Sequence, residues 1–251
     1  MNLPNPVLAK LRRGQVSVGS WLNLASPLAA EVMAVGGCEW LVVDAEHAPW
    51  DLGLITEGIR AIESQGCVPL VRPWSHDPTA FARILDAGAM GLVIPHVSTV
   101  GQAEAITMAV RYPPMGQRSS GTGRATISRD WSRQANDNLI ICPQIEDMEG
   151  VNNAKEIMAV DGMDVAYIGP ADLALSMGLT SADMFTHEDH AAAVARILAG
   201  AKANGKPAGT PVSSVDRART IIAQGFTMID YSSDLRLLQD AISDQLAAVQ
   251  A

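Results

Sequence analysis

Cysteine is scarce in this sequence, and the spacing of its few cysteines excludes two common uses of the residue. The three cysteines, Cys38, Cys67 and Cys142, are an odd number and cannot all pair within one chain. They lie in or beside apolar runs, without the CxxC spacing of zinc and redox motifs. We therefore expect reduced, buried thiols in a cytoplasmic protein.

Long apolar runs and an excess of basic residues are also absent. No apolar run reaches the roughly 18 residues of a membrane span, and the N-terminal segment MNLPNPVLAKLRRG lacks the apolar core of a signal peptide. The 18 lysines and arginines against 27 aspartates and glutamates give a net charge of -9. Phosphates would be repelled, so we expect no nucleic-acid partner and no membrane partner. An anionic substrate would need a local positive centre.

The sequence does contain a repeated alternation of short apolar runs and longer helical patterns, which is typical of βα units with a parallel sheet. The predicted strands are Val16–Leu22, Trp40–Asp44, Val68–Arg72, Gly91–Pro95, Ile140–Glu146, Val165–Ile168, Pro207–Pro211 and Met228–Tyr231. The predicted helices are Leu52–Glu63, Thr79–Ala87, Gly101–Val110, Ala154–Ala159, His190–Ala203, Val215–Ala223 and Leu235–Val249.

Eight strands with intervening helices in 251 residues favour a single (β/α)₈ barrel, residues 1–251, over an open doubly wound sheet. No strand is followed by the GxGxxG turn of a dinucleotide fold, so we expect no organic cofactor of that kind. The stretch Arg111–Asn138 is the one long irregular segment, and a loop of this length in a compact domain is typically functional or mobile. The amphipathic segment Leu235–Val249 either closes the barrel or reaches a neighbouring subunit.

Barrel enzymes place their sites at the C-terminal ends of the strands, and polar side chains gather at these ends here. They are Trp21 after the first strand, Asp44, Glu46 and His47 after the second, Arg72 after the third, Gln144 and Glu146 after the fifth, and Gly169, Ala171 and Asp172 after the sixth. We expect these residues to converge on one mouth of the barrel.

Glu146 and Asp172 are the predicted metal ligands. They follow consecutive strands, and two carboxylates with open positions suit magnesium or manganese, which prefer oxygen ligands and retain waters. A 2-oxo acid could fill further positions, and the N–H groups of the turn at Gly169 and Ala171 could bind its carboxylate. The alternative is structural: Glu146 caps the following helix, Asp172 is an N-cap, and the turn is a plain βα connection.

His47 and Arg72 are the predicted catalytic side chains. Asp44 would fix the tautomer of His47 as a base, with Glu46 as a rival that is instead solvent-facing or structural. The alternative for His47 is a loop histidine with local hydrogen bonds. Arg72 follows a buried strand, where its charge would stabilise a developing negative oxygen or form a structural salt bridge.

Other chemistry is poorly supported. A Schiff-base aldolase needs a lysine in the barrel mouth. Lys10, Lys155, Lys202 and Lys206 precede the barrel, lie on helices or start a strand. Gly121-Thr122-Gly123 follows no strand that would make it a phosphate loop. His187 and His190 have ligand spacing but no third ligand, so we expect them on a solvated surface.

The chain resembles the HpcH/HpaI aldolase family, and the resemblance covers most of the sequence in matching order. The matching segments are EWLVVDAEHAPWD (39–51), PLVRPW (69–74), LDAGAMGLVIPHV (85–97), RYPPMGQR (111–118), PQIEDMEGVNNAKEIMAVDGMD (143–164) and YIGPADLALSMG (167–178). The combination of the EH strand end, the QIE strand and the IGPADL turn is specific. The segment SSGTGRATI departs from the alanine-rich loop of the family.

The resemblance implies a (β/α)₈ barrel, and a homo-hexamer built as a dimer of trimers in which neighbouring subunits swap the C-terminal helix. It implies magnesium, manganese or cobalt as the metal, with 2-oxo acid and aldehyde as substrates. The family's site residues match Glu146 and Asp172 (metal), His47 (catalytic), Asp44 (its acidic partner), Arg72 (enolate stabilisation), Gln144, and the backbone of Gly169 and Ala171 (carboxylate). Asp86 matches an acidic residue that the family presents to a neighbouring subunit's site.

The sequence therefore predicts a divalent-metal-dependent aldolase that cleaves 4-hydroxy-2-oxo acids to pyruvate, or a related 2-oxo acid such as hydroxypyruvate, and an aldehyde. Three alternatives stay open. One is a decarboxylase or macrophomate-synthase-like lyase that uses the same activated 2-oxo acid. Another is a phosphate-binding barrel, which the segments TPVSS and YSSD support poorly. The third is a non-catalytic sugar-acid-binding barrel.

Overall fold

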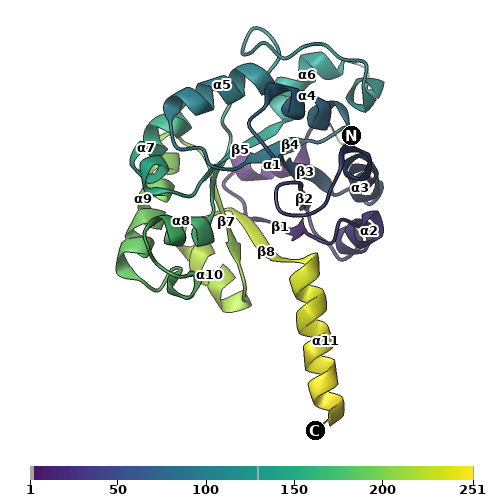
Figure 1. Ribbon diagram of the computed structural model, residues 1–251. Coiled ribbons are helices and arrows are strands. Elements are labelled where there is room, and N and C mark those ends of the chain that lie inside the picture. The colour runs from purple at the N-terminus through teal and green to yellow at the C-terminus, as the bar shows by residue number, and fades with distance from the viewer. Residues whose placement is uncertain (1–2, 129, 251) are drawn as a thin grey trace.

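Parallel strands close into a barrel in the computed structural model, which describes residues 3–128 and 130–250 (Figure 1). Within these residues, eight strands pair in chain order and the last strand pairs with the first. The strands are β1 (Ser17–Leu22), β2 (Trp40–Asp44), β3 (Val68–Arg72), β4 (Gly91–Ile94), β5 (Ile140–Ile145), β6 (Ala166–Ile168), β7 (Ala208–Val212) and β8 (Met228–Ser233). The predicted (β/α)₈ fold is confirmed; residues 1, 2 and 251 of the predicted domain, and residue 129 of the predicted loop, lie outside the described residues.

The strands form where the sequence has short, dense apolar runs. Strands β2 to β6 are buried along their whole lengths, because helices cover the outside of the barrel and side chains fill its inside. The β2–β3 register pairs each residue from Trp40↔Val68 to Asp44↔Arg72. Two charged residues therefore end neighbouring strands side by side at one mouth of the barrel.

Helices surround the sheet and are capped by the residues that precede them. They are α1 (Pro6–Arg12), α2 (Pro27–Val35), α3 (Leu52–Ser64), α4 (Pro78–Asp86), α5 (Val100–Val110), α6 (Trp131–Asn138), α7 (Met148–Ala159), α8 (Pro170–Ser176), α9 (Glu188–Ala203), α10 (Val215–Gln224) and α11 (Asp234–Gln250), with 3₁₀ turns η1 (Arg124–Ile127) and η2 (Ser181–Asp183). The side chains of Asp51, Thr99, Asp147 and Ser214 each accept a hydrogen bond from a first-turn N–H. Such caps replace bonds that a helix start lacks.

Several sequence-based expectations need correction. Helices α1 and α2 were not predicted, although Asn5 and Ser26 cap them and proline follows each cap. The segment Arg111–Asn138 is not irregular throughout, because it contains η1 and α6. Helix α6 is polar in sequence, and its two apolar residues, Trp131 and Ala135, lie four positions apart and are both buried against the core.

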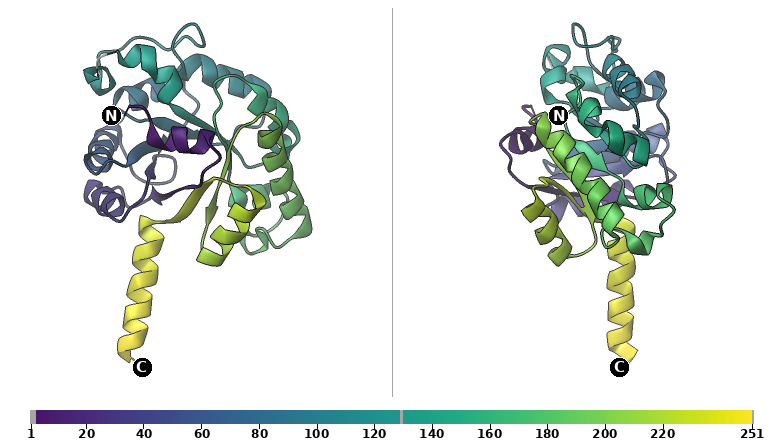
Figure 2. Two further views of the ribbon diagram at one scale, coloured as in Figure 1. Left: turned by 180° about the vertical axis from the view of Figure 1, so that it is seen from behind. Right: turned by 90° about the vertical axis from the view of Figure 1, so that its left-hand side faces the viewer.

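Helix α11 projects away from the barrel as a single extended rod (Figures 1 and 2). Its apolar side chains are exposed at helical spacing; these are Leu235, Leu238, Ile242, Leu246 and Val249. A helix with an uncovered apolar stripe marks a surface for association. Among the described helices, none combines the length and apolarity needed to cross a membrane.

Candidate active site

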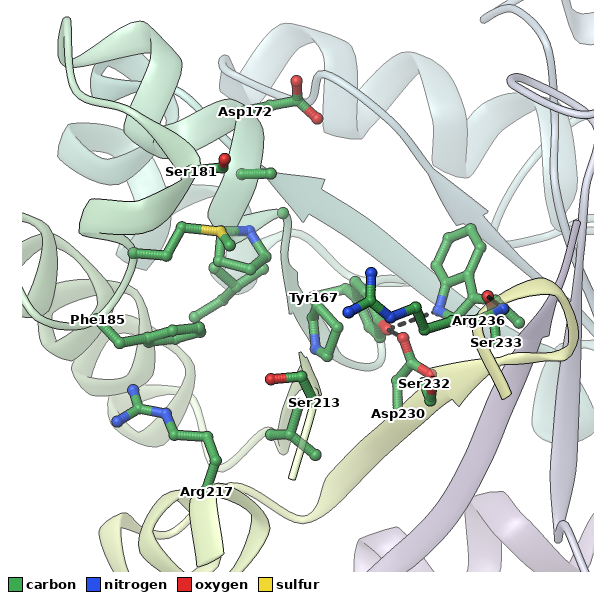
Figure 3. Close-up of a pocket in the computed structure, with 18 of the residues that line it drawn as sticks. Tyr167, Asp172, Ser181, Phe185, Ser213, Arg217, Asp230, Ser232, Ser233 and Arg236 are labelled. Carbon is green, nitrogen blue, oxygen red and sulfur yellow. Dashed lines mark hydrogen bonds between the residues drawn. The ribbon is translucent and has the colours of Figure 1, made fainter. Parts of the chain in front are cut away.

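A cavity of about 800 Å³ opens at the C-terminal ends of the strands (Figure 3). Its walls include the predicted residues Trp21, Asp44, Arg72, Gln144, Gly169, Ala171 and Asp172. Residues from η2 and the chain after it, and from the connection between β7 and α10, extend the walls outward. The barrel therefore brings these seven predicted residues, which lie far apart in sequence, to one cavity.

Asp44 and Arg72 form a two-pronged ion pair at the floor of the cavity. Arg72 Nε donates to Asp44 Oδ1 at 2.8 Å and Arg72 Nη2 donates to Asp44 Oδ2 at 2.7 Å. Glu46 Oε2 lies 3.2 Å from Arg72 Nε, and the Trp21 ring lies 4.4 Å beneath the guanidinium carbon. Burial opposes the charge of Arg72, but the bond and charge of Asp44, together with Glu46, raise its pKa. Arg72 is thus a fixed cation that faces the cavity.

The imidazole of His47 lies beside Glu46. His47 Nε2 is 3.7 Å from Glu46 Oε2, whereas Asp44 Oδ1 accepts a bond from the His47 backbone N–H. The Asp44 oxygens already accept bonds from Arg72 and from Asn23. The structure therefore places Glu46 next to the His47 ring, in the position that the sequence assigned to Asp44. Only 15% of the Glu46 side chain is exposed, so the solvent-facing interpretation of this residue is wrong.

Glu146 is a buried carboxylate held by several donors. Oε1 accepts a 2.7 Å bond from the His96 backbone N–H, and Oε2 accepts a 2.5 Å bond from Gln144 Nε2. Burial and the nearby charge of Asp172 raise the pKa of Glu146 to about 7, although the bonds from His96 and Gln144 act in the opposite direction. A buried carboxylate beside a second carboxylate is the environment that a bound cation stabilises.

The turn at Gly169 holds Asp172 near Glu146. Gly169 is the N-cap of α8, and a Cβ atom there would collide with Glu146 Oε2 and Gln144 Nε2. Only glycine permits this close approach. Asp172 lies in the first turn of α8 and is not its cap, and Asp147, not Glu146, caps α7. The capping alternatives for the two carboxylates are therefore wrong.

The residues present fit a hard divalent cation. Gln144 Oε1 is buried and has no hydrogen-bond partner, so it can accept from a water held at the site. Within residues 3–128 and 130–250, no three acidic, histidine or cysteine side chains group as a closed metal cage. Two carboxylates that leave positions to water or substrate are typical of magnesium and manganese sites.

A second buried carboxyl group lies deeper in the barrel. Trp21 Nε1 donates to the Tyr167 hydroxyl at 3.1 Å, and this hydroxyl lies 3.3 Å from Asp230 Oδ2 (Figure 3). Burial raises the pKa of Asp230 well above its usual range. Strand β8 thus brings to the wall of the cavity a carboxyl group whose protonated form is favoured by burial.

The comparison with known families matches the HpcH/HpaI aldolase/citrate lyase model over residues 17–241. The chain belongs to this family. The resemblance seen in the sequence is thereby confirmed, and the predicted class of carbon–carbon lyase is confirmed at the level of the family.

Relatives in this family are similar over nearly the whole chain. The 2-keto-3-deoxy-L-rhamnonate aldolase of Shigella boydii serotype 4 (strain Sb227) is 34% identical, over 98% of this chain and 93% of that protein. A structure of an HpcH/HpaI aldolase/citrate lyase family protein from Burkholderia cenocepacia J2315 has 33% identity and a TM-score of 0.93, over 98% of this chain and 100% of that one. The structure of macrophomate synthase has 26% identity and a TM-score of 0.87, over 99% of this chain and 89% of that one.

Some predicted residues lie outside the cavity of this family member. Asp86 lines no part of it and instead forms a 2.7 Å ion pair with Arg118, against the loop glycines Gly121 and Gly123. His190 is fully buried, so its predicted place on a solvated surface is wrong. Its ring nitrogens form hydrogen bonds with Phe185 N and Pro170 O, and these bonds replace those that water would make at a surface.

Sequence reasoning missed His96 and Asp230. His96 follows β4 after Pro95, so the same test of strand ends would have found it. Its Nδ1 is 3.1 Å from Glu146 Oε1, and its backbone has a left-handed φ of 54° that aims the N–H at this carboxylate. Asp230 lies within the run MIDYSS, which gives no sign that its side chain faces inward.

Proposed function

We propose that this chain catalyses divalent-metal-dependent aldol cleavage and condensation of 4-hydroxy-2-oxo acids, giving pyruvate, or a related 2-oxo acid such as hydroxypyruvate, and an aldehyde. The observation that carries the proposal is a cavity lined by Asp172, Gln144 and the Arg72 cation, with the buried carboxylate of Glu146 bonded to Gln144. The charge of Asp172 acts on Glu146. The name of the curated relative, an aldolase acting on a 2-keto-3-deoxy sugar acid, supports the same substrate class.

Glu146 and Asp172 would hold magnesium, manganese or cobalt. When bound, such a cation supplies Lewis-acid activation of the 2-oxo group and lowers the pKa of a coordinated water. Gln144 keeps Glu146 in position through its 2.5 Å bond. The backbone N–H groups at Gly169 and Ala171, at the start of α8, would bind the substrate carboxylate.

Arg72 would stabilise negative charge that develops on the substrate oxygen. Its bonds to Asp44 prevent it from swinging away, so no reorganisation is needed when charge appears. His47, with 62% of its side chain exposed beside Glu46, would accept and return the proton of the reacting carbon or hydroxyl. Trp21 would line the acceptor side and support Arg72 from below.

The test is loss of the pyruvate methyl signal in proton NMR in D₂O, with magnesium or manganese and with EDTA. We expect metal-dependent exchange in the wild type. In Glu146→Gln and in Asp172→Ala the exchange rate should fall by about a hundredfold or more. Glu149→Gln is the matched control, because Glu149 is exposed on α7. Near-normal exchange in both site variants, or exchange that survives EDTA, would refute the metal assignment.

Decarboxylation is a second candidate reaction, since the chain is similar to macrophomate synthase over most of its length. The same cavity would then act on oxaloacetate. Pyruvate formation from oxaloacetate without aldehyde, at a rate above that of any aldol cleavage, would favour this reaction over the aldolase.

The assembly that we propose is a homo-hexamer, a dimer of trimers with swapped α11 helices. The support is the exposed stripe of Leu238, Ile242 and Leu246 on a helix that projects from the barrel (Figure 2). A helix of 17 residues with this stripe in water gains little stability by itself. Docking on another copy would cover the stripe, and Asp86 would then serve a neighbouring site.

A further inference from the structure

The cavity continues beyond the strand ends into an outer chamber. This chamber is lined by Ser181, Met184, Phe185 and Thr186 on one side and by Ser213, Ser214 and Arg217 on the other. Figure 3 shows Asp172 and Arg217 on opposite sides of the cavity, with the Arg217 side chain directed towards Phe185. A 2-oxo acid bound near Asp172 would therefore extend its far end towards the chamber.

Arg217 is a cation without an acidic partner among the described residues. The other arginines of the cavity are neutralised: Arg72 by Asp44, and Arg236 by Asp240 at 3.1 Å. The Arg217 guanidinium carbon instead lies 4.0 Å from the centroid of the Phe185 ring, and its Nε is buried without a hydrogen-bond partner. Burial lowers the pKa of Arg217, because the guanidinium loses part of its hydration. A bound anion would compensate for that loss.

His190 holds Phe185, the aromatic residue on which Arg217 stacks, in position. The Phe185 N–H donates to His190 Nδ1 at 3.1 Å, and His190 Nε2 lies 2.9 Å from the Pro170 carbonyl oxygen. Nδ1 is therefore the acceptor, and the neutral ring carries its proton on Nε2, where it is the donor to Pro170. Pro170 belongs to the turn that carries Asp172. The buried histidine thus fixes the chamber relative to the predicted 2-oxo acid site.

We propose that Arg217, stacked on Phe185, binds an anionic group at the far end of the aldehyde and makes this chain selective for charged acceptors. The inference rests on the proposed function, since it names the class of acceptor for the same site. A planar guanidinium matches a carboxylate or a phosphate through paired N–H donors, and the serine and threonine hydroxyls of the chamber add further donors. With a net charge of -9, the protein would otherwise repel such a substrate.

The first experiment compares acceptors that differ in charge. The metal-loaded full chain is given pyruvate with succinic semialdehyde or butanal for the carboxylate, and with glyceraldehyde 3-phosphate or glyceraldehyde for the phosphate. We expect kcat/KM to favour the charged member of at least one pair by about tenfold or more, as for a hydrogen bond to a charged group. The pair with the larger ratio identifies the anion.

Three variants distinguish the loss of the Arg217 contact from a general loss of activity. In Arg217→Gln we expect this ratio to fall towards about one, with the rate for the uncharged aldehyde and the pyruvate methyl exchange unchanged. Arg217→Lys keeps the charge but not the planar fork and should retain part of the ratio. Arg219→Gln is the matched control, because Arg219 lies on the same helix, is 76% exposed and pairs with Asp216.

A binding measurement gives a readout that does not depend on turnover. Calorimetry of 2-oxoadipate and 2-oxohexanoate compares two ligands of equal length that differ in the distal carboxylate. We expect the preference for 2-oxoadipate to be lost in Arg217→Gln and kept in Arg219→Gln. Equal values for charged and uncharged compounds in the wild type, or a preference that survives Arg217→Gln, would overturn the inference. Absence of pyruvate exchange in every protein would instead refute the proposed function, and the calorimetry would still decide the role of Arg217.

Discussion

Replacement of Asp230 by asparagine should make the stability of the protein less dependent on pH. Asp230 is only 3% exposed; its Oδ2 lies 3.3 Å from the Tyr167 hydroxyl, and its Oδ1 has no hydrogen-bond partner. Burial raises its pKa, while the bonds of Tyr167 and Trp21 and the positive charge of Arg72 oppose that rise without cancelling it. Cys38 is the other titratable group that senses its charge. Asp230 is therefore protonated in the folded chain at pH values where an unfolded aspartate has lost its proton.

The sign and the size of the effect follow from proton linkage. A pKa that is higher in the folded state contributes stability that is complete below the unfolded value, about 3.9, and is lost as the pH rises towards the folded value. At pH values between the unfolded and the folded pKa of Asp230, the folded chain keeps a proton that the unfolded chain releases. In that range the wild type should lose up to about 1.4 kcal/mol of unfolding free energy per pH unit relative to Asp230→Asn.

Urea denaturation of both proteins at pH 5 and pH 6, in EDTA, measures this difference. Asp216→Asn is the control, since Asp216 is 94% exposed and should show no such change. Where unfolding is not two-state, potentiometry during unfolding at pH 6 should show more proton released by the wild type than by Asp230→Asn, up to about one per chain. An unchanged free-energy difference and equal proton release would show that Asp230 is ionised in the folded protein.

Three further outcomes are expected. In Gly169→Ala the added Cβ displaces Glu146, so the affinity for manganese, measured by calorimetry, should fall by about tenfold or more. The circular dichroism spectrum should stay unchanged. An unaltered affinity would contradict the close packing of Gly169 against Glu146. Manganese at about 100 times its dissociation constant should raise the unfolding free energy of the wild type by about 2.7 kcal/mol, and Asp172→Ala should lack this gain; equal gains in both would remove Asp172 from the metal site. The double substitution Leu238→Glu with Ile242→Glu should dissociate the assembly in light scattering, because it places charges on the exposed stripe of α11; an unchanged mass would argue against a role of α11 in association.

Much of the barrel could be predicted because its strands are apolar runs that end at charged residues. The predicted ranges Trp40–Asp44 and Val68–Arg72 agree with β2 and β3 residue by residue. Both faces of such a strand are buried, so its sequence is continuously apolar and its end is visible where polarity returns. Helix α2 was missed because its sequence, PLAAEVMAV, is apolar on nearly all sides, so no contrast between an apolar and a polar face marked it as a helix.

The positions of the predicted site residues were visible in the sequence, since each follows a strand of a barrel whose active sites lie at that end. Their roles stay predictions, and their partners could not be foreseen. The assignment of Asp44 to the His47 ring followed nearness in sequence and the family resemblance. The β2–β3 register instead places Asp44 beside Arg72 and leaves Glu46 next to the ring. Which side chain faces which is a matter of register and strand tilt, and these are set by packing of the whole barrel.

The sequence by itself determined the class of fold, the family and the mouth of the barrel at which polar groups collect, because these depend on local hydrophobic period and on motifs that lie within single segments. Only the tertiary structure decided which charges are compensated. His190 is buried because Phe185 and Pro170, 5 and 20 residues away in the chain, satisfy both its ring nitrogens. Arg217 lies on the Phe185 ring with its Nε unbonded, and Asp230 is buried with one carboxylate oxygen unbonded. Both environments depend on all the elements that surround the residue.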